Sequence, residues 1–115
     1  MDKLIITVAG VGAETTKEAQ PGLPVTADEI GADAARCREA GAAMYHLHVR
    51  DAEANPTQAR EVFAAAIEEI RKRTDIIIQT STGGAMGMTA DERLQPLELS
   101  PEMASCSRMK RGLET

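Results

Sequence analysis

Aromatic side chains are almost absent from this sequence of 115 residues. It contains no Trp, one Tyr and one Phe, so aromatic residues make up only 2% of the chain. Since the hydrophobic fraction is an ordinary 43%, a folded core must be built mainly from Ala, Ile, Leu, Val and Met. A chain of this length has room for one small domain, and we therefore expect a single aliphatic core.

The sequence also lacks an excess of positive charge and any long apolar run. A net charge of −5 excludes the basic surfaces that bind nucleic acid or anionic membranes. No segment approaches the roughly 18 apolar residues of a membrane span, and the start "MDKLIITVAGVGA" is more typical of a buried strand than of a signal peptide. The two cysteines, Cys37 and Cys106, form no CxxC motif, which indicates free thiols in a reducing compartment. We therefore expect a soluble cytoplasmic protein without nucleic-acid or membrane partners.

Apolar segments alternate between the strand and the helix pattern. Three runs predict strands, at residues 4–9 ("LIITVA"), 42–49 ("AAMYHLHV") and 75–81 ("DIIIQTS"). The first is continuous and β-branched, so we expect it to be buried on both faces. Helices are predicted from Thr26 and from Thr89, each opening a "TADE" capping box, and over residues 59–73; Pro96 should shorten or kink the last one. The segment between residues 51 and 58 is predicted to be a loop.

The resulting β-α-β-α-β-α order indicates an α/β fold with a parallel sheet. A dinucleotide-binding unit is one possibility, but only Gly10 and Gly12 fit its glycine motif, Thr15 stands at the third position, and the helix begins too late. The other possibility is a TIM (β/α)8 barrel, which needs eight strands and about 250 residues. We therefore predict the N-terminal β-α-β-α-β-α part of such a barrel. An incomplete barrel should expose an unpaired edge and an uncovered apolar face.

The stretch "MYHLHVR" places the only two histidines of the chain, His46 and His48, on one predicted strand. Because side chains alternate along a strand, both should point to the same side as Met44. Near the carboxyl end of a barrel strand, such a pair offers two neutral nitrogen ligands to a divalent transition metal. Two histidines on a strand also occur without a metal, and the spacing alone leaves both interpretations open.

Two further segments follow the other strands. The glycines of "STGGAMG", from Ser81 to Gly87, could free backbone amides to bind an anion, or could serve a tight turn that needs positive φ. Glu14, in the loop after the first strand, would by itself be interpreted as a solvated surface carboxylate. Because the carboxyl ends of parallel strands lie side by side, however, we expect Glu14, the histidine pair and Ser81–Gly84 to converge on a site for a small keto acid.

Several ordered motifs resemble one family of enzymes. The segments "GAETT", "QPGLP", "HLHVRD", "IQTSTGG", "RLQPLEL" and "PEMAS" closely resemble the β-keto acid cleavage enzymes, typified by the 3-keto-5-aminohexanoate cleavage enzyme of lysine fermentation. The resemblance implies a zinc-dependent (β/α)8 barrel, usually a homotetramer. It also implies an acyltransferase reaction in which a β-keto acid and acetyl-CoA, the co-substrate, give acetoacetate and a new acyl-CoA.

The resemblance assigns roles to particular residues. It implies that His46 and His48 bind Zn²⁺, which would polarise the substrate's ketone and carboxylate oxygens. It implies that Glu14 is an acidic residue of the pocket and that it and Ser81 take part in catalysis. The keto-acid pocket would be formed by Glu14, Ser81, Thr82, Gly83, Gly84 and Ser105, the last at the end of a fourth strand.

The sequence also departs from the family pattern. The family's third zinc ligand, a glutamate on a late strand, and a nearby arginine and aspartate have no counterpart here. Residues 1–105 follow the pattern, whereas the tail 106–115, "CSRMKRGLET", diverges, and we hypothesise a truncated or frame-shifted coding sequence. We therefore expect little activity from the isolated chain. The alternatives are a non-catalytic metal- or anion-binding βα fragment, perhaps half of a split barrel, or a βα domain that binds a phosphate ligand through its Gly-rich loop.

Overall fold

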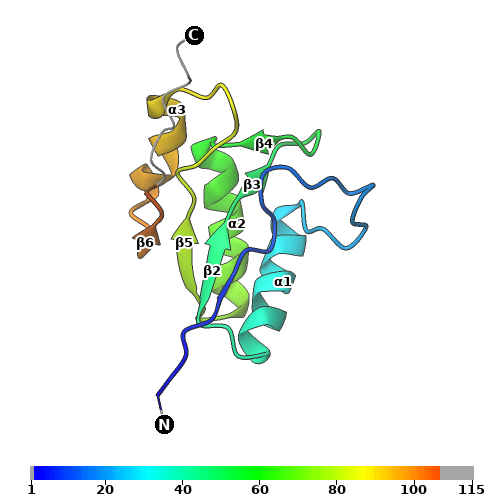
Figure 1. The fold of residues 1–115 in the computed structure, drawn as a ribbon, viewed down its shortest axis with the longest axis vertical. Coiled ribbons are helices and arrows are strands. Elements are labelled where there is room, and N and C mark those ends of the chain that lie inside the picture. Colours follow the sequence, from blue (N-terminus) through cyan, green and yellow to red (C-terminus); the bar gives the residue numbers. More distant parts are fainter. Residues whose placement is uncertain (1, 107–115) are drawn as a thin grey trace.

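Parallel strands with helices between them make up the structure, a computed structural model that describes residues 2–106 (Figure 1). The elements are β1 (Thr7–Val8), α1 (Ala27–Glu39), β2 (Met44–Leu47), β3 (Val49–Arg50), β4 (Pro56–Thr57), α2 (Arg60–Arg73), β5 (Ile77–Thr80), α3 (Ala90–Leu94), the 3-10 helix η1 (Gln95–Leu99) and β6 (Met103–Ala104). Four strands form one parallel sheet in the order β1-β2-β5-β6. The predicted parallel α/β arrangement is therefore confirmed. No helix within residues 2–106 is long and apolar enough to cross a membrane.

The helices begin where the sequence predicts. The Thr26 hydroxyl accepts a hydrogen bond from the Glu29 amide (3.2 Å), but the Glu29 carboxylate accepts from the Val25 amide (3.0 Å) rather than from Thr26. At α3 both halves of the capping box are present, between Thr89 and Glu92. The helix then continues as η1, which has a proline in its first turn, so the expected shortening is confirmed. Satisfying these amides fixes the point at which the chain leaves each loop and enters its helix.

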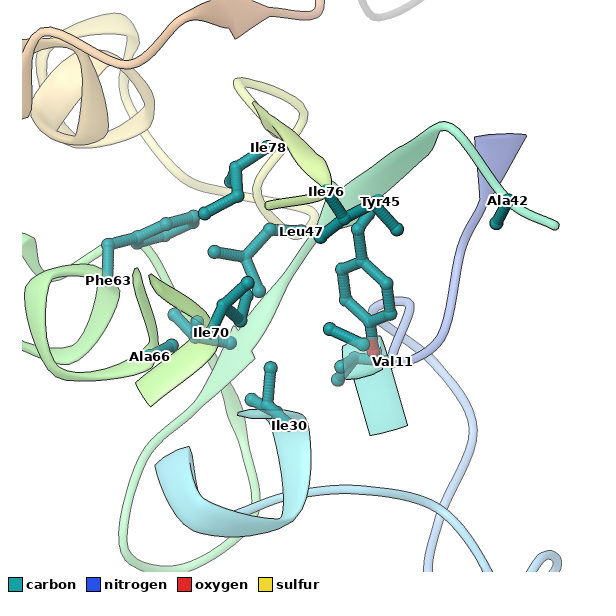
Figure 2. Close-up of a cluster of buried hydrophobic side chains, with 12 residues drawn as sticks. Val11, Ile30, Ala42, Tyr45, Leu47, Phe63, Ala66, Ile70, Ile76 and Ile78 are labelled. Carbon is teal, nitrogen blue, oxygen red and sulfur yellow. The ribbon is translucent and has the colours of Figure 1, made fainter. Parts of the chain in front are cut away.

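Helices α1 and α2 cover one face of the sheet and enclose the aliphatic core (Figure 2). From β2, Tyr45 and Leu47 point toward the helices and are fully buried. Other members of the core come from the loops, the helices and β5: Val11, Ile30, Ala34, Ala42, Val49, Phe63, Ala66, Ile70, Ile76 and Ile78. Each large apolar side chain buried here contributes about 1.5–3 kcal/mol to stability. The single Tyr and the single Phe of the chain, Tyr45 and Phe63, are both buried in this core.

The loop after β1 packs closely against the Tyr45 hydroxyl. This hydroxyl donates to the Asp33 carboxylate of α1 at 2.7 Å, and burial together with this bond raises the pKa of Tyr45 above its ordinary range. Gly10 lies directly against both groups, and a Cβ at this position would overlap the Tyr45 hydroxyl. Glycine is therefore needed at residue 10 for the close approach of the backbone, not for an unusual φ angle.

The first strand differs from its prediction. Only Thr7–Val8 pair as β1, and Leu4, Ile5 and Ile6 are 84%, 72% and 44% exposed, so the expectation of burial on both faces is wrong. The physical reason is position, because β1 lies at the edge of the sheet and bonds only to β2. A β-branched run indicates a strand but does not indicate what packs on either side of it.

The second strand also ends earlier than predicted. It leaves the parallel sheet after Leu47, and β3 pairs antiparallel with β4, which lies in the segment 51–58 that was predicted to be a loop. The connecting turn contains Ala54 at φ 65°. Positive φ is uncommon for alanine, so the sequence does not indicate a turn at this residue. His48 lies between the two strands and belongs to neither.

The face of the sheet opposite the helices is open within the described residues. Strand alternation and register place Met44, Ile77, Gln79 and Met103 on this face together with His46. Ile77 and Met103 remain 39% and 44% exposed. The predicted uncovered apolar face is therefore present in residues 2–106, and it is the face that carries the histidines.

A matched pair of glycine substitutions tests the packing at Tyr45. Gly10→Ala should lower the free energy of unfolding by about 1–3 kcal/mol, because the new methyl group must displace Tyr45 or Asp33. Gly22→Ala, where a Cβ would meet only a Gln20 side-chain atom at 3.5 Å, should change it by less than about 0.5 kcal/mol. Urea unfolding followed by circular dichroism measures both values. Equal stabilities of the two variants would contradict the packing described here.

Candidate metal and keto-acid site

The two histidines lie on the open face at the carboxyl end of β2. Both side chains are half-buried, whereas their neighbours Tyr45, Leu47 and Val49 are buried on the helix side. Their rings meet edge to face, with centroids 5.1 Å apart and an interplanar angle of 71°. The prediction that His46 and His48 share one face is therefore confirmed.

His48 is held in its neutral form. Burial, followed by the nearby His46 and the Arg50 guanidinium, lowers the pKa of His48 to about 4. At pH 7 a histidine with such a pKa is neutral. One of its ring nitrogens carries a proton, and the other has a free lone pair. The neutral imidazole is the form in which histidine binds a metal ion.

His46 is hydrogen-bonded to the neighbouring strand. Its Nδ1 lies 2.7 Å from Oε1 of Gln79, which is paired with it in the β2–β5 register. Gln79 was not among the residues selected from the sequence. The available signal was a lone amide within the otherwise apolar run "IIIQT", at a position that alternation places on the histidine side.

Ser81 begins the loop after β5 and lies beside the end of β2. Its amide donates to the Leu47 carbonyl at 3.0 Å, and its carbonyl accepts from the buried Gln58 side chain at 2.9 Å. Its hydroxyl oxygen accepts from the Gly83 amide at 3.0 Å, and the residue is only 2% exposed. The structure therefore brings Ser81 to the end of the strand that bears the histidines. Gln58, which supports it, was missed by the sequence analysis.

Thr82 and Ser105 are also brought together, across the ends of β5 and β6. The Thr82 hydroxyl donates to the Ser105 carbonyl at 2.6 Å, and the Thr82 amide donates to the Ser105 hydroxyl at 3.3 Å. Since Ser105 directly follows β6, three predicted pocket residues lie at adjacent strand ends. Their proximity depends on parallel pairing between strands that are far apart in sequence.

The Gly-rich turn uses its amides internally. The amides of Ser81, Thr82 and Gly83 all have acceptors within the protein, so they are not free to bind an anion. Gly84 adopts φ 59°, and a Cβ there would lie 2.8 Å from Sδ of Met88. The positive φ of the turn therefore accounts for glycine at residue 84. The structure does not support an anion site formed by the amides of Ser81, Thr82 and Gly83.

Glu14 is not brought to the histidines. Its side chain is exposed and makes no hydrogen bond or ion pair with another residue of 2–106. The loop that carries it is anchored at one end by Arg50, which is 5% exposed and donates through Nε and Nη2 to the Gly12 carbonyl. At the other end Leu23 is buried. The structure thus brings the Ser81 backbone to the strand end that carries the histidines, whereas Glu14 does not join the histidine pair.

Arg50 also connects the first loop to the β3–β4 hairpin. Its Nη1 donates to the Ala54 carbonyl at 3.1 Å, so one guanidinium holds two segments next to the histidine pair. The sequence signal was an arginine directly after an apolar strand, for which no role was predicted. Within residues 2–106 no three or more His, Cys, Asp and Glu side chains are gathered closely enough to hold a metal ion, so a third ligand is not found there.

Comparison with known proteins adds to these observations. The profile of the β-keto acid cleavage enzymes matches residues 3–111. The chain is 56% identical over 106 residues to a 3-keto-5-aminohexanoate cleavage enzyme of Fusobacterium nucleatum subsp. nucleatum and 53% identical over 106 residues to one of Acetoanaerobium sticklandii. Each alignment covers 91% of this chain and 39% of the relative.

A more distant relative carries a different name. A 3,5-dioxohexanoate:acetyl-CoA acetone transferase of Paraburkholderia graminis is 43% identical over 105 residues, covering 90% of this chain and 34% of the relative. The chain therefore spans about two fifths of the length of the two relatives described first. The family match extends over nearly all of the chain and includes the strand ends described above. This chain belongs to the β-keto acid cleavage enzyme family.

Proposed function

We propose that this chain provides the zinc-binding and keto-acid-binding strand ends of a β-keto acid cleavage enzyme built on a (β/α)8 barrel. The single observation that carries the proposal is the edge-to-face pair of His46 and neutral His48 at the carboxyl end of β2. Family membership and the parallel order β1-β2-β5-β6 support it, since barrel active sites lie at the carboxyl ends of the strands.

The histidine pair fits a zinc ion in chemistry and in spacing. Two imidazoles bound to one tetrahedral zinc at about 2.0–2.1 Å have ring centres roughly 5 Å apart. The observed separation is 5.1 Å. Because a catalytic zinc needs a third protein ligand, and residues 2–106 bring none to the pair, another segment has to supply it.

The reaction we propose is an acyl exchange in which one carbon–carbon bond breaks and another forms. A β-keto acid loses its carboxymethyl part to the acetyl group of acetyl-CoA, which gives acetoacetate, while the remaining acyl group goes to CoA. Bound zinc would supply Lewis-acid polarisation of the ketone oxygen. The hydroxyl groups of Ser81 and Ser105, which accept from backbone amides and keep their own protons, would donate to the oxygens of the keto acid at the ends of β5 and β6. Thr82, whose hydroxyl donates to the Ser105 carbonyl, would hold Ser105 in place.

Glu14 would complete the pocket as its acidic residue. For this its loop has to fold over the histidine pair, because the carboxylate is exposed in the structure. The Arg50 bond at Gly12 fixes the start of that loop two residues before Glu14, so only a short segment has to move.

We further propose 3-keto-5-aminohexanoate as the β-keto acid. The two relatives named for its cleavage are 56% and 53% identical to this chain, compared with 43% for the acetone transferase. The carboxylate of Glu14 would suit the positively charged amine of this substrate.

Metal binding tests the histidine pair directly. In a Cys106→Ser background, which removes an exposed thiol, the chain should bind one Zn²⁺ or Co²⁺ per molecule with modest affinity. His46→Ala and His48→Ala should each weaken binding by at least about ten-fold, whereas Met44→Ala on the same face should not. Competition with a chromophoric chelator measures these affinities. Unchanged binding in both histidine variants would refute the assignment.

Activity is best tested in a complete barrel. We expect a chimera that carries residues 3–105 of this chain in place of the matching segment of the Fusobacterium nucleatum relative to form acetoacetate from 3-keto-5-aminohexanoate and acetyl-CoA. His46→Ala or His48→Ala in the chimera should lower kcat/KM by about 10³-fold or more. Glu39→Gln, at the exposed end of α1, should leave it unchanged. An active His46→Ala/His48→Ala chimera would exclude the proposed role.

A second candidate is a metal-binding βα unit that acts only together with another polypeptide. The open face that bears Ile77 and Met103 beside the histidines favours it, because exposed apolar surface of this kind marks a site of association. The 115 residues alone should then show little turnover. Addition in trans of the part of the Fusobacterium nucleatum relative that follows the matching segment should restore acetoacetate formation. Robust turnover by the 115-residue chain alone would contradict this candidate.

A further inference from the structure

Gln79 forms a hydrogen bond with one member of the histidine pair. It lies on β5, and the parallel register pairs it with His46, so both side chains emerge on the open face. Its Oε1 lies 2.7 Å from Nδ1 of His46. Paired side chains of neighbouring strands are held near each other by the backbone ladder, so this contact is built into the sheet.

The hydrogen bond determines which nitrogen of His46 carries the proton. A carbonyl oxygen can only accept, so Nδ1 must be the donor. A neutral imidazole has one N–H, and the lone pair is then on Nε2. Rotation about χ1 and χ2 is restricted by the same bond, which keeps the ring in one orientation relative to its neighbour on the strand.

His48 has no comparable restraint. Within residues 2–106 its ring makes the edge-to-face contact with His46 and no hydrogen bond. The two imidazoles are therefore held unequally, one by an amide of the adjacent strand and the other only by packing. A substitution at Gln79 should act on His46 alone.

We propose that Gln79 is a positioning residue: its side-chain carbonyl fixes His46 as the Nδ1–H tautomer and presents Nε2 to a metal cation. This deepens the proposed function and rests on it for the identity of the ligand. Groups that orient a metal-binding histidine in this way contribute about 10–100-fold to metal affinity in other proteins. Gln79 would thus raise the metal affinity of His46 from β5, the strand next to β2 in the sheet.

The tautomer can be measured without any metal. Long-range ¹H–¹⁵N correlation spectra distinguish the two nitrogens of neutral imidazoles, and the chain has only two histidines to assign. The metal-free protein should show His46 as Nδ1–H. In Gln79→Leu the His46 signals should shift to predominantly Nε2–H, whereas Gln79→Glu, which keeps an acceptor, should retain Nδ1–H. Gln20→Leu, the same change in an exposed loop, should leave the spectrum unaltered.

Metal affinity provides the second measurement. Gln79→Leu should weaken Co²⁺ binding by about 10–100-fold, and Gln79→Glu should restore it to within about three-fold of the starting protein. Nε2–H at His46 in the unmodified protein, or an unchanged tautomer and affinity in Gln79→Leu, would overturn the inference. The expected tautomers without metal binding in any variant would support the role of Gln79 and refute the zinc assignment instead.

Discussion

The parallel pairing of β2 with β5 is the constraint on which the site depends. In this register Leu47 is paired with Thr80 and His46 with Gln79, so the last residues of both strands end at the same level. The Ser81 amide then donates to the Leu47 carbonyl and extends the ladder by one bond beyond the strands. A slip of one residue would turn the histidines toward the helices and Leu47 toward the open face. The aliphatic core and the placement of the histidine pair are therefore specified by the same hydrogen bonds.

The two faces of the sheet are packed differently. On the helix side, α1 and α2 pack around Tyr45. The Tyr45 hydroxyl donates to the Asp33 carboxylate, and the backbone of Gly10 lies against it. The other side bears His46 and Gln79 near the strand ends, with the exposed Met103 at the same level of the sheet and the exposed Ile77 two residues earlier on β5. A domain that completed its core within these residues would cover both sides. This one places its two histidines on the side that residues 2–106 leave uncovered.

Local features were well predicted from the sequence, because their causes are local. The Thr89 capping box, the helix over residues 60–73 and the shared face of His46 and His48 all follow from spacing within a few residues. Alternation alone placed Tyr45 on the opposite face, and its burial confirms that inference.

What the sequence did not reveal depends on distant partners. The shortness of β1 reflects its position at an edge, and the β3–β4 hairpin depends on pairing that no motif marked. Gln79 bonds to His46, 33 residues away in the sequence, and Arg50 bonds to Gly12, 38 residues away. Glu14 was assigned to the pocket by resemblance to the family, and its exposed side chain shows that a shared sheet edge does not by itself bring a loop side chain inward. The zinc site and the barrel remain predictions.

The loop between Gly12 and Leu23 is anchored at both ends, and between them the exposed side chain of Lys17 pairs with Glu29 of α1 at 3.1 Å. The guanidinium of Arg50 holds its first carbonyl, the core holds its last side chain, and residues 14 to 22 are all exposed. Lengthening such a segment is thermodynamically cheap, since doubling a loop costs only about 0.6 kcal/mol in closure entropy. This makes the segment a natural insertion point. New recognition elements could be grafted there without changing how the domain folds.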